Sequence, residues 1–122
     1  MMIQRLPFDF SVCKVTDFSS LPLQSPYCFV GKTEEENSLV CLTQDVPANT
    51  TAREDGWKAF RVQGVLDFSL VGILAELSTL LAKHEIGLFA VSTYNTDYIL
   101  VKEKNFEKAL QVLADAGHTV TA

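Results

Sequence analysis

The residues best suited to bind a small molecule lie in the polar segment Tyr94-Asn95-Thr96-Asp97, which separates two apolar runs. Asp97 precedes the apolar run 98–101, so we expect its carboxylate at the margin of a sheet, where it can pair with an ammonium or guanidinium group. The other three residues offer further polar contacts. The alternative is a turn carboxylate that bonds its own backbone, and residue chemistry alone favours that alternative.

A second group of candidate residues precedes a predicted helix. Asp67 and Ser69 can both cap a helix, which we expect to begin near Leu70. The unpaired N–H groups and positive dipole end of a helix suit the α-carboxylate of an amino acid, with Ser69 and the backbone of Leu70 and Val71 as donors. Gly72, one turn into this helix, allows either close packing on a sheet or clearance for a ligand.

The sequence shows no recognisable catalytic or metal-binding motif. A nucleophile beside a base, a phosphate-binding glycine loop and histidines at metal-binding intervals are all absent. Cys13, Cys28 and Cys41 lie in strand-like runs, where cysteine is more often a small buried hydrophobe than a reactive thiol. His84 lies at the end of the first predicted helix and His118 follows the second, where each can cap the last turn. We predict neither an enzyme nor a bound metal or cofactor.

Composition limits the classes of partner. The net charge is -5 and no basic cluster is present, so we do not expect nucleic acid binding. The N-terminus lacks the apolar stretch of a signal peptide, and no segment approaches the roughly 20 apolar residues of a membrane-spanning helix. With 48% apolar residues the chain can bury a core without disulfides. These features favour a cytoplasmic protein that does not contact membranes.

The C-terminal half has the pattern of an α+β module. Apolar periodicity and turn residues predict, in order, a strand, a helix, a hairpin, a second helix capped by Asn105 and a short strand, over 57–63, 70–84, 88–101, 105–117 and 118–121. The order β-α-β-β-α-β is the split βαβ arrangement of ferredoxin-like folds. Both helices then cover one face of an antiparallel sheet.

The N-terminal half has similar strands without clear helices. Strands are expected over 8–15, 27–32 and 38–43. The connections 17–26 and 45–55 are too short, or too rich in Pro, Ser, Thr and Asn, for full helices. We therefore predict a reduced copy of the module over 1–56 and a complete one over 57–122.

The runs 60–74 and 86–101 together resemble the ACT-domain family. More narrowly, they resemble small tandem ACT proteins of bacteria, related to CASTOR-type arginine sensors and to the regulatory ACT pairs of aspartokinases. The segment Ser-Thr-Tyr-x-Thr-Asp-Tyr at 92–98 is the most specific element. This resemblance implies two ferredoxin-like ACT modules with a ligand pocket at their junction. It also implies that Asp97 contacts a basic ligand, which reverses the preference for a turn carboxylate.

We therefore expect a non-catalytic regulatory protein that binds an amino acid at a module or subunit interface. The predicted ligand-binding residues are Asp67, Ser69, Leu70, Val71, Gly72, Tyr94, Asn95, Thr96 and Asp97. A homodimer is expected, because symmetric pairing is the commonest assembly, together with an unidentified regulated protein. The alternatives are a structural or oligomerisation module with an empty pocket, and an enzyme acting on an amino-acid derivative through Asp97.

Overall fold

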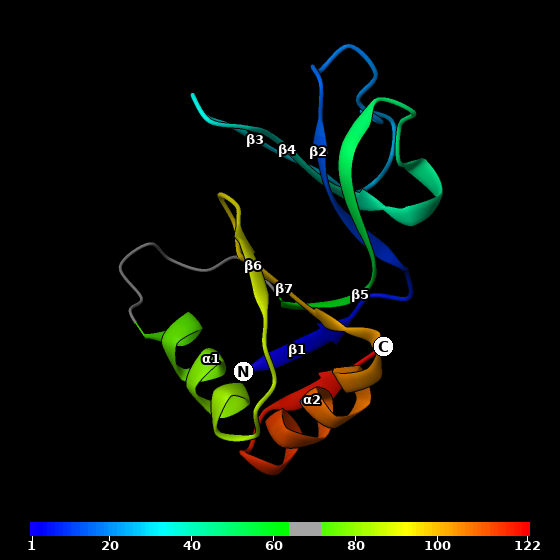
Figure 1. Cartoon of the computed structure of the whole chain (residues 1–122). Coiled ribbons are helices and arrows are strands. Elements are labelled where there is room, and N and C mark those ends of the chain that lie inside the picture. The colour runs from blue at the N-terminus through cyan, green and yellow to red at the C-terminus, as the bar shows by residue number, and fades with distance from the viewer. Residues whose placement is uncertain (64–71) are drawn as a thin grey trace. The chain divides into compact units, whose positions relative to one another are not determined.

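A computed structural model describes residues 1–63 and 72–122 (Figure 1). The chain divides into two compact units. Unit 1 comprises Met1–Pro7 with Lys58–Ala122, and unit 2 comprises Phe8–Trp57. The first seven residues therefore share a unit with the C-terminal half, whereas the sequence-based division grouped them with residues 8–56.

Unit 1 contains two α-helices and a mixed sheet. Its elements are β1 (Met2–Arg5), the end of β5 (Thr50–Val62), α1 (Ile73–Lys83), β6 (Phe89–Ser92), β7 (Asp97–Lys102), α2 (Glu103–Asp115) and β8 (Thr119–Thr121). The strands are ordered β6-β7-β5-β1-β8. From β5 onward the order β-α-β-β-α-β is as predicted, and the α+β class is confirmed.

The sheet of unit 1 departs from the expected antiparallel arrangement because β1 lies between β5 and β8. β1 is antiparallel to β5 but parallel to β8, with Ile3 opposite Val62 on one side and Val120 on the other. Ile3 is fully buried. Ile3 thus joins the core of unit 1, which periodicity in the C-terminal half alone does not indicate.

The core of unit 1 lies between the helices and the sheet. Leu77 and Leu81 of α1 are fully buried, and Leu74 and Leu80 pack at the edge of the core. From α2, the buried residues are Phe106, Ala109, Leu110, Val112 and Leu113. Steps of three and four place these side chains on one side of each helix, as predicted.

Both helices begin at residues other than those predicted. α1 begins at Ile73, with Gly72 at its N-cap in the left-handed region at φ 85°. Gly72 is therefore not inside the helix, and a Cβ there would meet no described atom within 4 Å, so close packing does not require this glycine. Its conformation does, because L side chains rarely adopt it. α2 begins at Glu103 after Lys102, which places the predicted N-cap Asn105 within the first turn.

Unit 2 is a four-stranded antiparallel sheet. Its elements are β2 (Phe10–Val15), β3 (Cys28–Lys32), β4 (Asn37–Leu42), the 3-10 helix η1 (Thr43–Asp45) and the first part of β5, in the sheet order β3-β4-β2-β5. All of residues 8–57 are described and none forms an α-helix. The three predicted strands are confirmed, but the connection predicted over 45–55 is wrong, because β5 already begins at Thr50.

A small apolar core lies on one face of this sheet. Cys13, Val15, Leu39 and Cys41 are buried there, and Phe18, Leu21, Cys28 and Val46 pack around them. The cysteines are free thiols in the interior or half-buried, as predicted.

Among the helices that the structure describes in either unit, none is long and apolar enough to cross a membrane.

Candidate functional site

The predicted polar segment forms the turn of the β6–β7 hairpin. Thr93 closes the turn, because its N–H donates to the carbonyl of Thr96 at 2.9 Å and its hydroxyl donates to the same oxygen at 3.1 Å. Tyr94 is 80% exposed, and Asn95 is also exposed. The tip of the turn therefore presents polar side chains to solvent.

Thr96 holds this turn against β5. Its side chain is 4% exposed, and its hydroxyl donates to the carbonyl of Val62, the last residue of β5, at 2.7 Å. A buried hydroxyl with such a bond is held rigidly, since breaking the bond leaves polar atoms unsatisfied. The sequence suggested a ligand contact for Thr96; the structure shows its hydroxyl engaged with the backbone.

Asp97 is the first residue of β7 and lies opposite Ser92 of β6. The Ser92 hydroxyl donates to Oδ1 of Asp97 at 2.6 Å. The hydrogen bond recorded for the Asp97 carboxylate is therefore with a side chain on the neighbouring strand. The Asp97 side chain is half-buried at the sheet margin, where the sequence predicted it.

The hairpin turn and the beginning of α1 lie at the same end of the unit 1 sheet. The chain leaves β5 at Val62, enters α1 at Ile73, and returns along β6 to the turn that Thr96 anchors to Val62. Gly72 and Asp97 are thereby brought to one end of the sheet. The predicted donors and cap residues lie outside the described residues: Asp67, Ser69, Leu70 and Val71.

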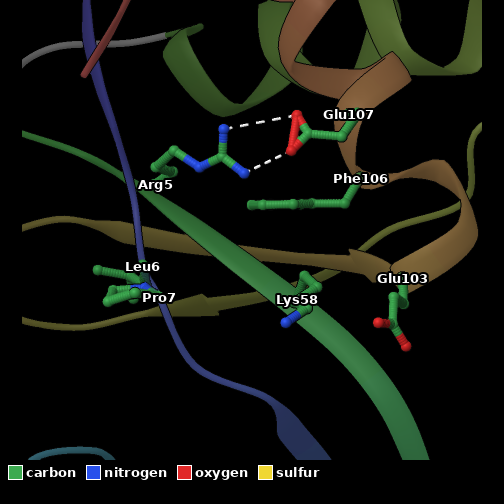
Figure 2. Close-up of a pocket in the computed structure, with 7 residues that line it drawn as sticks. All are labelled: Arg5, Leu6, Pro7, Lys58, Glu103, Phe106 and Glu107. Atoms are coloured by element: carbon green, nitrogen blue, oxygen red, sulfur yellow. Dashed lines mark hydrogen bonds and ion pairs between the residues drawn. The ribbon is translucent and has the colours of Figure 1, made fainter. Parts of the chain in front are cut away.

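A second surface of unit 1 was not anticipated from the sequence (Figure 2). It is a pocket of about 370 Å³ lined by Arg5, Leu6, Pro7, Lys58, Glu103, Phe106 and Glu107. The Arg5 guanidinium lies 5.4 Å from the centroid of the Phe106 ring and donates to the Glu107 carboxylate at 2.5 and 3.4 Å. These residues come from opposite ends of the chain, so no local motif could reveal the pocket.

The two histidines have different environments. His84 is the C-cap residue of α1, and its Nδ1 lies 3.1 Å from the carbonyl oxygen of Leu80, which confirms the predicted capping role. At the end of α2 the backbone N–H of His118 donates to the carbonyl of Leu113 at 3.1 Å, whereas its side chain is directed to α1 and not to the helix end that the sequence suggested. His118 is 8% exposed, and its Nε2 lies 3.2 Å from Oε1 of Glu76 on α1.

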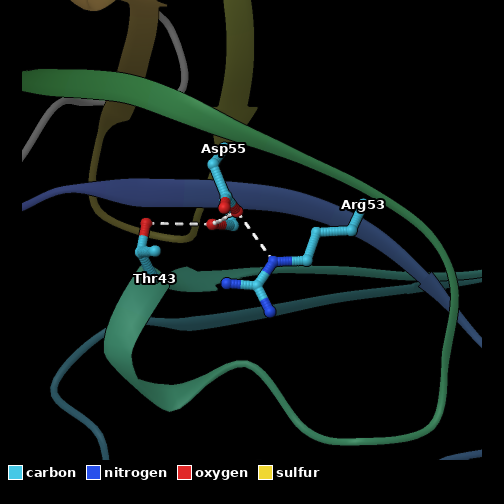
Figure 3. Close-up of polar contacts among 4 residues, drawn as sticks. Thr43, Arg53 and Asp55 are labelled. Carbon is cyan, nitrogen blue, oxygen red and sulfur yellow. Dashed lines mark hydrogen bonds and ion pairs between the residues drawn. The ribbon is translucent and has the colours of Figure 1, made fainter.

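Unit 2 contains a polar cluster that links three of its elements (Figure 3). Ser11 of β2 donates to Oδ1 of Asp55 at 2.5 Å and shares a 2.9 Å hydrogen bond with the hydroxyl of Thr43. Arg53 Nε donates to the same Asp55 oxygen at 2.8 Å. Two hydrogen bonds lower the pKa of the Asp55 carboxyl below its usual value. The one from Arg53 has the larger effect and the one from Ser11 the next largest.

Hydroxyl groups in contact with a carboxylate occur in catalytic proton relays. The geometry of this cluster is instead that of a structural contact. Ser11 is fully buried, so a substrate cannot reach its hydroxyl. The cluster lies where the β2–β5 register shifts between Phe10 and Val12, opposite Gly56 at φ 86°. Its hydrogen bonds fix a β-bulge, which leaves backbone groups outside the regular ladder. Among the described residues, no group of histidines, cysteines and carboxylates could hold a metal ion.

Comparison with known proteins places this geometry in a family. The family model for the ACT domain matches residues 52–115. A protein from Agrobacterium tumefaciens of known crystal structure is 28% identical, with a TM-score of 0.84 over 98% of this chain and 91% of that one. A Vibrio cholerae protein described as a possible transport protein is 21% identical, with a TM-score of 0.73 over 93% and 88% of the two chains.

Regulatory parts of a metabolic enzyme share the fold. The regulatory subunit of aspartate kinase from Thermus thermophilus, in its ligand-free form, gives a TM-score of 0.59 at 9% identity and covers 94% of each chain. The matched family segment contains the end of β5, both helices and the β6–β7 hairpin. The α+β architecture and this match agree, and the chain belongs to the ACT-domain family.

Proposed function

We propose that this protein is a non-catalytic regulatory ACT protein that binds an amino acid. The proposed site lies at the end of the unit 1 sheet where β5 ends, between the beginning of α1 and the β6–β7 turn. The observation that supports it is the hydrogen bond from Thr96 to Val62, which fixes the turn, and with it Asp97, at the end of the sheet where α1 begins.

The charges at this end of the sheet match those of an amino acid. The N–H groups at the start of α1 carry partial positive charge and suit an α-carboxylate. The Asp97 carboxylate suits an ammonium or guanidinium group at the other end of the ligand. Ser69 and the backbone of Leu70 and Val71, which precede the first residue of α1, remain proposed donors, with Asp67, Tyr94 and Asn95 as further polar contacts.

Thermal unfolding with each common amino acid at millimolar concentration tests this function. A ligand that binds only the folded state raises the melting temperature in a saturable way, because it adds RT ln(1 + [L]/Kd) to the stability. We expect one amino acid, or one chemical class of them, to do so. No shift with any amino acid, for protein shown to be folded by circular dichroism, would contradict the proposal.

A matched pair of variants locates the ligand. Asp97→Asn removes the negative charge with little change in size and should abolish the shift. Asp115→Asn changes a carboxylate of the same unit at the end of α2, where it accepts a hydrogen bond from Gln111, and should leave the shift intact. A shift that survives Asp97→Asn would move the site away from the turn.

One observation favours a second function, that of a structural module without ligand. The hydroxyl of Thr96 and one oxygen of Asp97 already have partners within the protein. In that case the turn residues serve only to stabilise the hairpin. The thermal screen separates the two functions, since a structural module gains no stability from any amino acid.

The remaining proposals concern assembly. We propose a tandem arrangement, in which unit 1 contains a complete ACT module and unit 2 a reduced one. We also propose a homodimer with the ligand at the subunit interface, and a regulated partner protein. Light scattering of the eluting protein with and without the stabilising amino acid tests the dimer. A monomer at all concentrations would contradict it.

A further inference from the structure

Two of the three thiols face each other across a pair of strands in unit 2. Cys28 of β3 and Cys41 of β4 are direct partners in the antiparallel ladder. They share one face of the sheet, and Cys41 is fully buried there while Cys28 is half-buried. Because β3 is the edge strand of this sheet, the Cys28 side is the more open of the two.

The hydrogen-bonding pattern of the β3–β4 ladder brings the side chains of Cys28 and Cys41 close together. The turn of the hairpin is closed by a hydrogen bond from the Thr33 N–H to the Glu36 carbonyl at 3.0 Å. Hydrogen-bonded and non-hydrogen-bonded pairs alternate from that point, which makes Cys28 and Cys41 a non-hydrogen-bonded pair. In such pairs the Cα atoms are about 4.5 Å apart and the side chains are closest. A disulfide requires a Cα–Cα distance of about 4.4–6.8 Å, so this pair is within range.

Cys13 provides an internal contrast. It lies on the same face, but it pairs with Leu39, whereas Cys41 pairs with Ser11. Cys13 is therefore a diagonal neighbour of Cys41, at about 7–8 Å. That separation exceeds the reach of a disulfide without movement of the backbone. The register thus selects one of the possible pairings.

We propose that Cys28 and Cys41 form a site of reversible oxidation, which hydrogen peroxide converts to a disulfide. The Cys28 sulfur attacks a peroxide oxygen, becomes a sulfenic acid and releases one water. The Cys41 sulfur then attacks the Cys28 sulfur, and the hydroxyl group leaves as a second water. The two thiols lose two electrons and two protons, which together reduce the peroxide. A dithiol reductant reverses the reaction.

The environment makes this reaction slow at neutral pH. Burial raises the pKa of Cys28, and burial together with the neighbouring thiols and Asp45 raises the pKa of Cys41 to about 12, against a small opposing effect of Arg53. The thiolate is the nucleophile, so the site responds to sustained peroxide. Its oxidation rate should rise with pH.

The experiment treats the reduced protein with hydrogen peroxide in the absence of denaturant. Thiols are counted afterwards in denaturant, and the linked peptides are identified by mass spectrometry. The chain has three cysteines, and we expect two of the three thiols to be lost, the Cys28 and Cys41 peptides to be linked, and dithiothreitol to restore all of them. Far-UV circular dichroism should be unchanged by oxidation.

Two variants make the assignment specific. Cys28→Ser should prevent disulfide formation. It disturbs the fold less than a substitution of the fully buried Cys41 would, because Cys28 is half-buried on the edge strand. Cys13→Ser should form the disulfide at the rate of the original protein. Three remaining thiols, a link that involves Cys13, or oxidation of Cys28 to sulfinic acid without a link would each overturn the proposal. The peptide map of the unmodified sequence decides the matter even if a variant fails to fold.

Discussion

Unit 1 and unit 2 cover one face of a sheet with different kinds of contact. In unit 1, two helices bury leucine, valine and phenylalanine side chains against the strands. In unit 2, a few residues of the connecting segments, such as Phe18 and Leu21, pack over the buried thiols, and the hydrogen-bonded cluster around Ser11 links the strands. The difference indicates that apolar burial dominates the stability of unit 1, whereas unit 2 depends more strongly on individual polar contacts.

The largest effect should follow from a cavity in the core of unit 1. Leu77 is fully buried in α1, so Leu77→Ala should lower the free energy of unfolding by about 2–5 kcal/mol, measured by urea denaturation. Leu23→Ala is the control, because Leu23 is exposed and should change stability by no more than about 0.5 kcal/mol. Equal effects of the two substitutions would contradict the assigned core.

In unit 2 the most sensitive polar residue should be Ser11. Ser11→Ala removes the donor to Asp55 and the partner of Thr43, and should cost about 1–3 kcal/mol in urea denaturation because buried polar groups lose their partners. Ser78→Ala removes an exposed hydroxyl on α1 and should cost far less. A negligible effect of Ser11→Ala would show that the cluster does not stabilise unit 2.

Thr96 tests the anchor of the proposed binding site. Thr96→Val keeps the shape of the side chain but removes the hydrogen bond to Val62, and should cost about 0.5–1.5 kcal/mol. It should also weaken the thermal shift given by the bound amino acid, since the turn is no longer fixed. Thr96→Ser retains the hydroxyl and should recover much of both losses. Unchanged ligand affinity in Thr96→Val would separate the turn from the site.

The cluster of unit 2 should make stability depend on pH in the acid range. The pKa of Asp55 is lower in the folded protein than in the unfolded chain, because Arg53 and Ser11 donate to its carboxylate. The resulting stabilisation is present above the unfolded pKa of about 3.9 and is lost as the pH falls toward the folded value. Asp55→Asn should therefore flatten the pH dependence of urea unfolding below about pH 4. An unchanged slope would contradict this origin.

The smallest effect should come from the ion pair beside the pocket of unit 1. Arg5 and Glu107 are both substantially exposed, and exposed pairs contribute about 0.2–1 kcal/mol. Glu107→Gln should lower stability by no more than that, and added salt should reduce the difference further. A loss comparable to that of Leu77→Ala would mean that this pair is far less solvated than its exposure indicates.

Local patterns predicted much of the fold. The apolar faces of α1 and α2 and most strands followed from periodicity, because each depends on residues close in sequence, but the first part of β5 lies in a segment predicted to be a connection. The position of β1 between β5 and β8, and the pocket at Arg5 and Phe106, depend on contacts between the two ends of the chain. The left-handed Gly72 was mistaken for a helical residue because the apolar pattern begins before it.

The candidate site was only partly predictable for a similar reason. The turn 94–97 was identified from its polar composition, and the position of Asp97 at the sheet margin followed from the apolar run after it. The Thr96 hydroxyl donates to the carbonyl of Val62, and the Asp97 carboxylate accepts from the hydroxyl of Ser92. Those partners are fixed by strand register and by the pairing of the hairpin with β5, which composition does not specify.

Amide chemical-shift mapping of the isotopically labelled protein, titrated with each common amino acid, tests the central claim most directly. We predict saturable shifts at Gly72 and across Thr93–Asp97 with one class of amino acid, and little change at Arg5, Phe106 and Glu107. Saturable shifts confined to the Arg5 pocket would place the ligand elsewhere. The absence of saturable shifts with every amino acid would contradict the binding function itself.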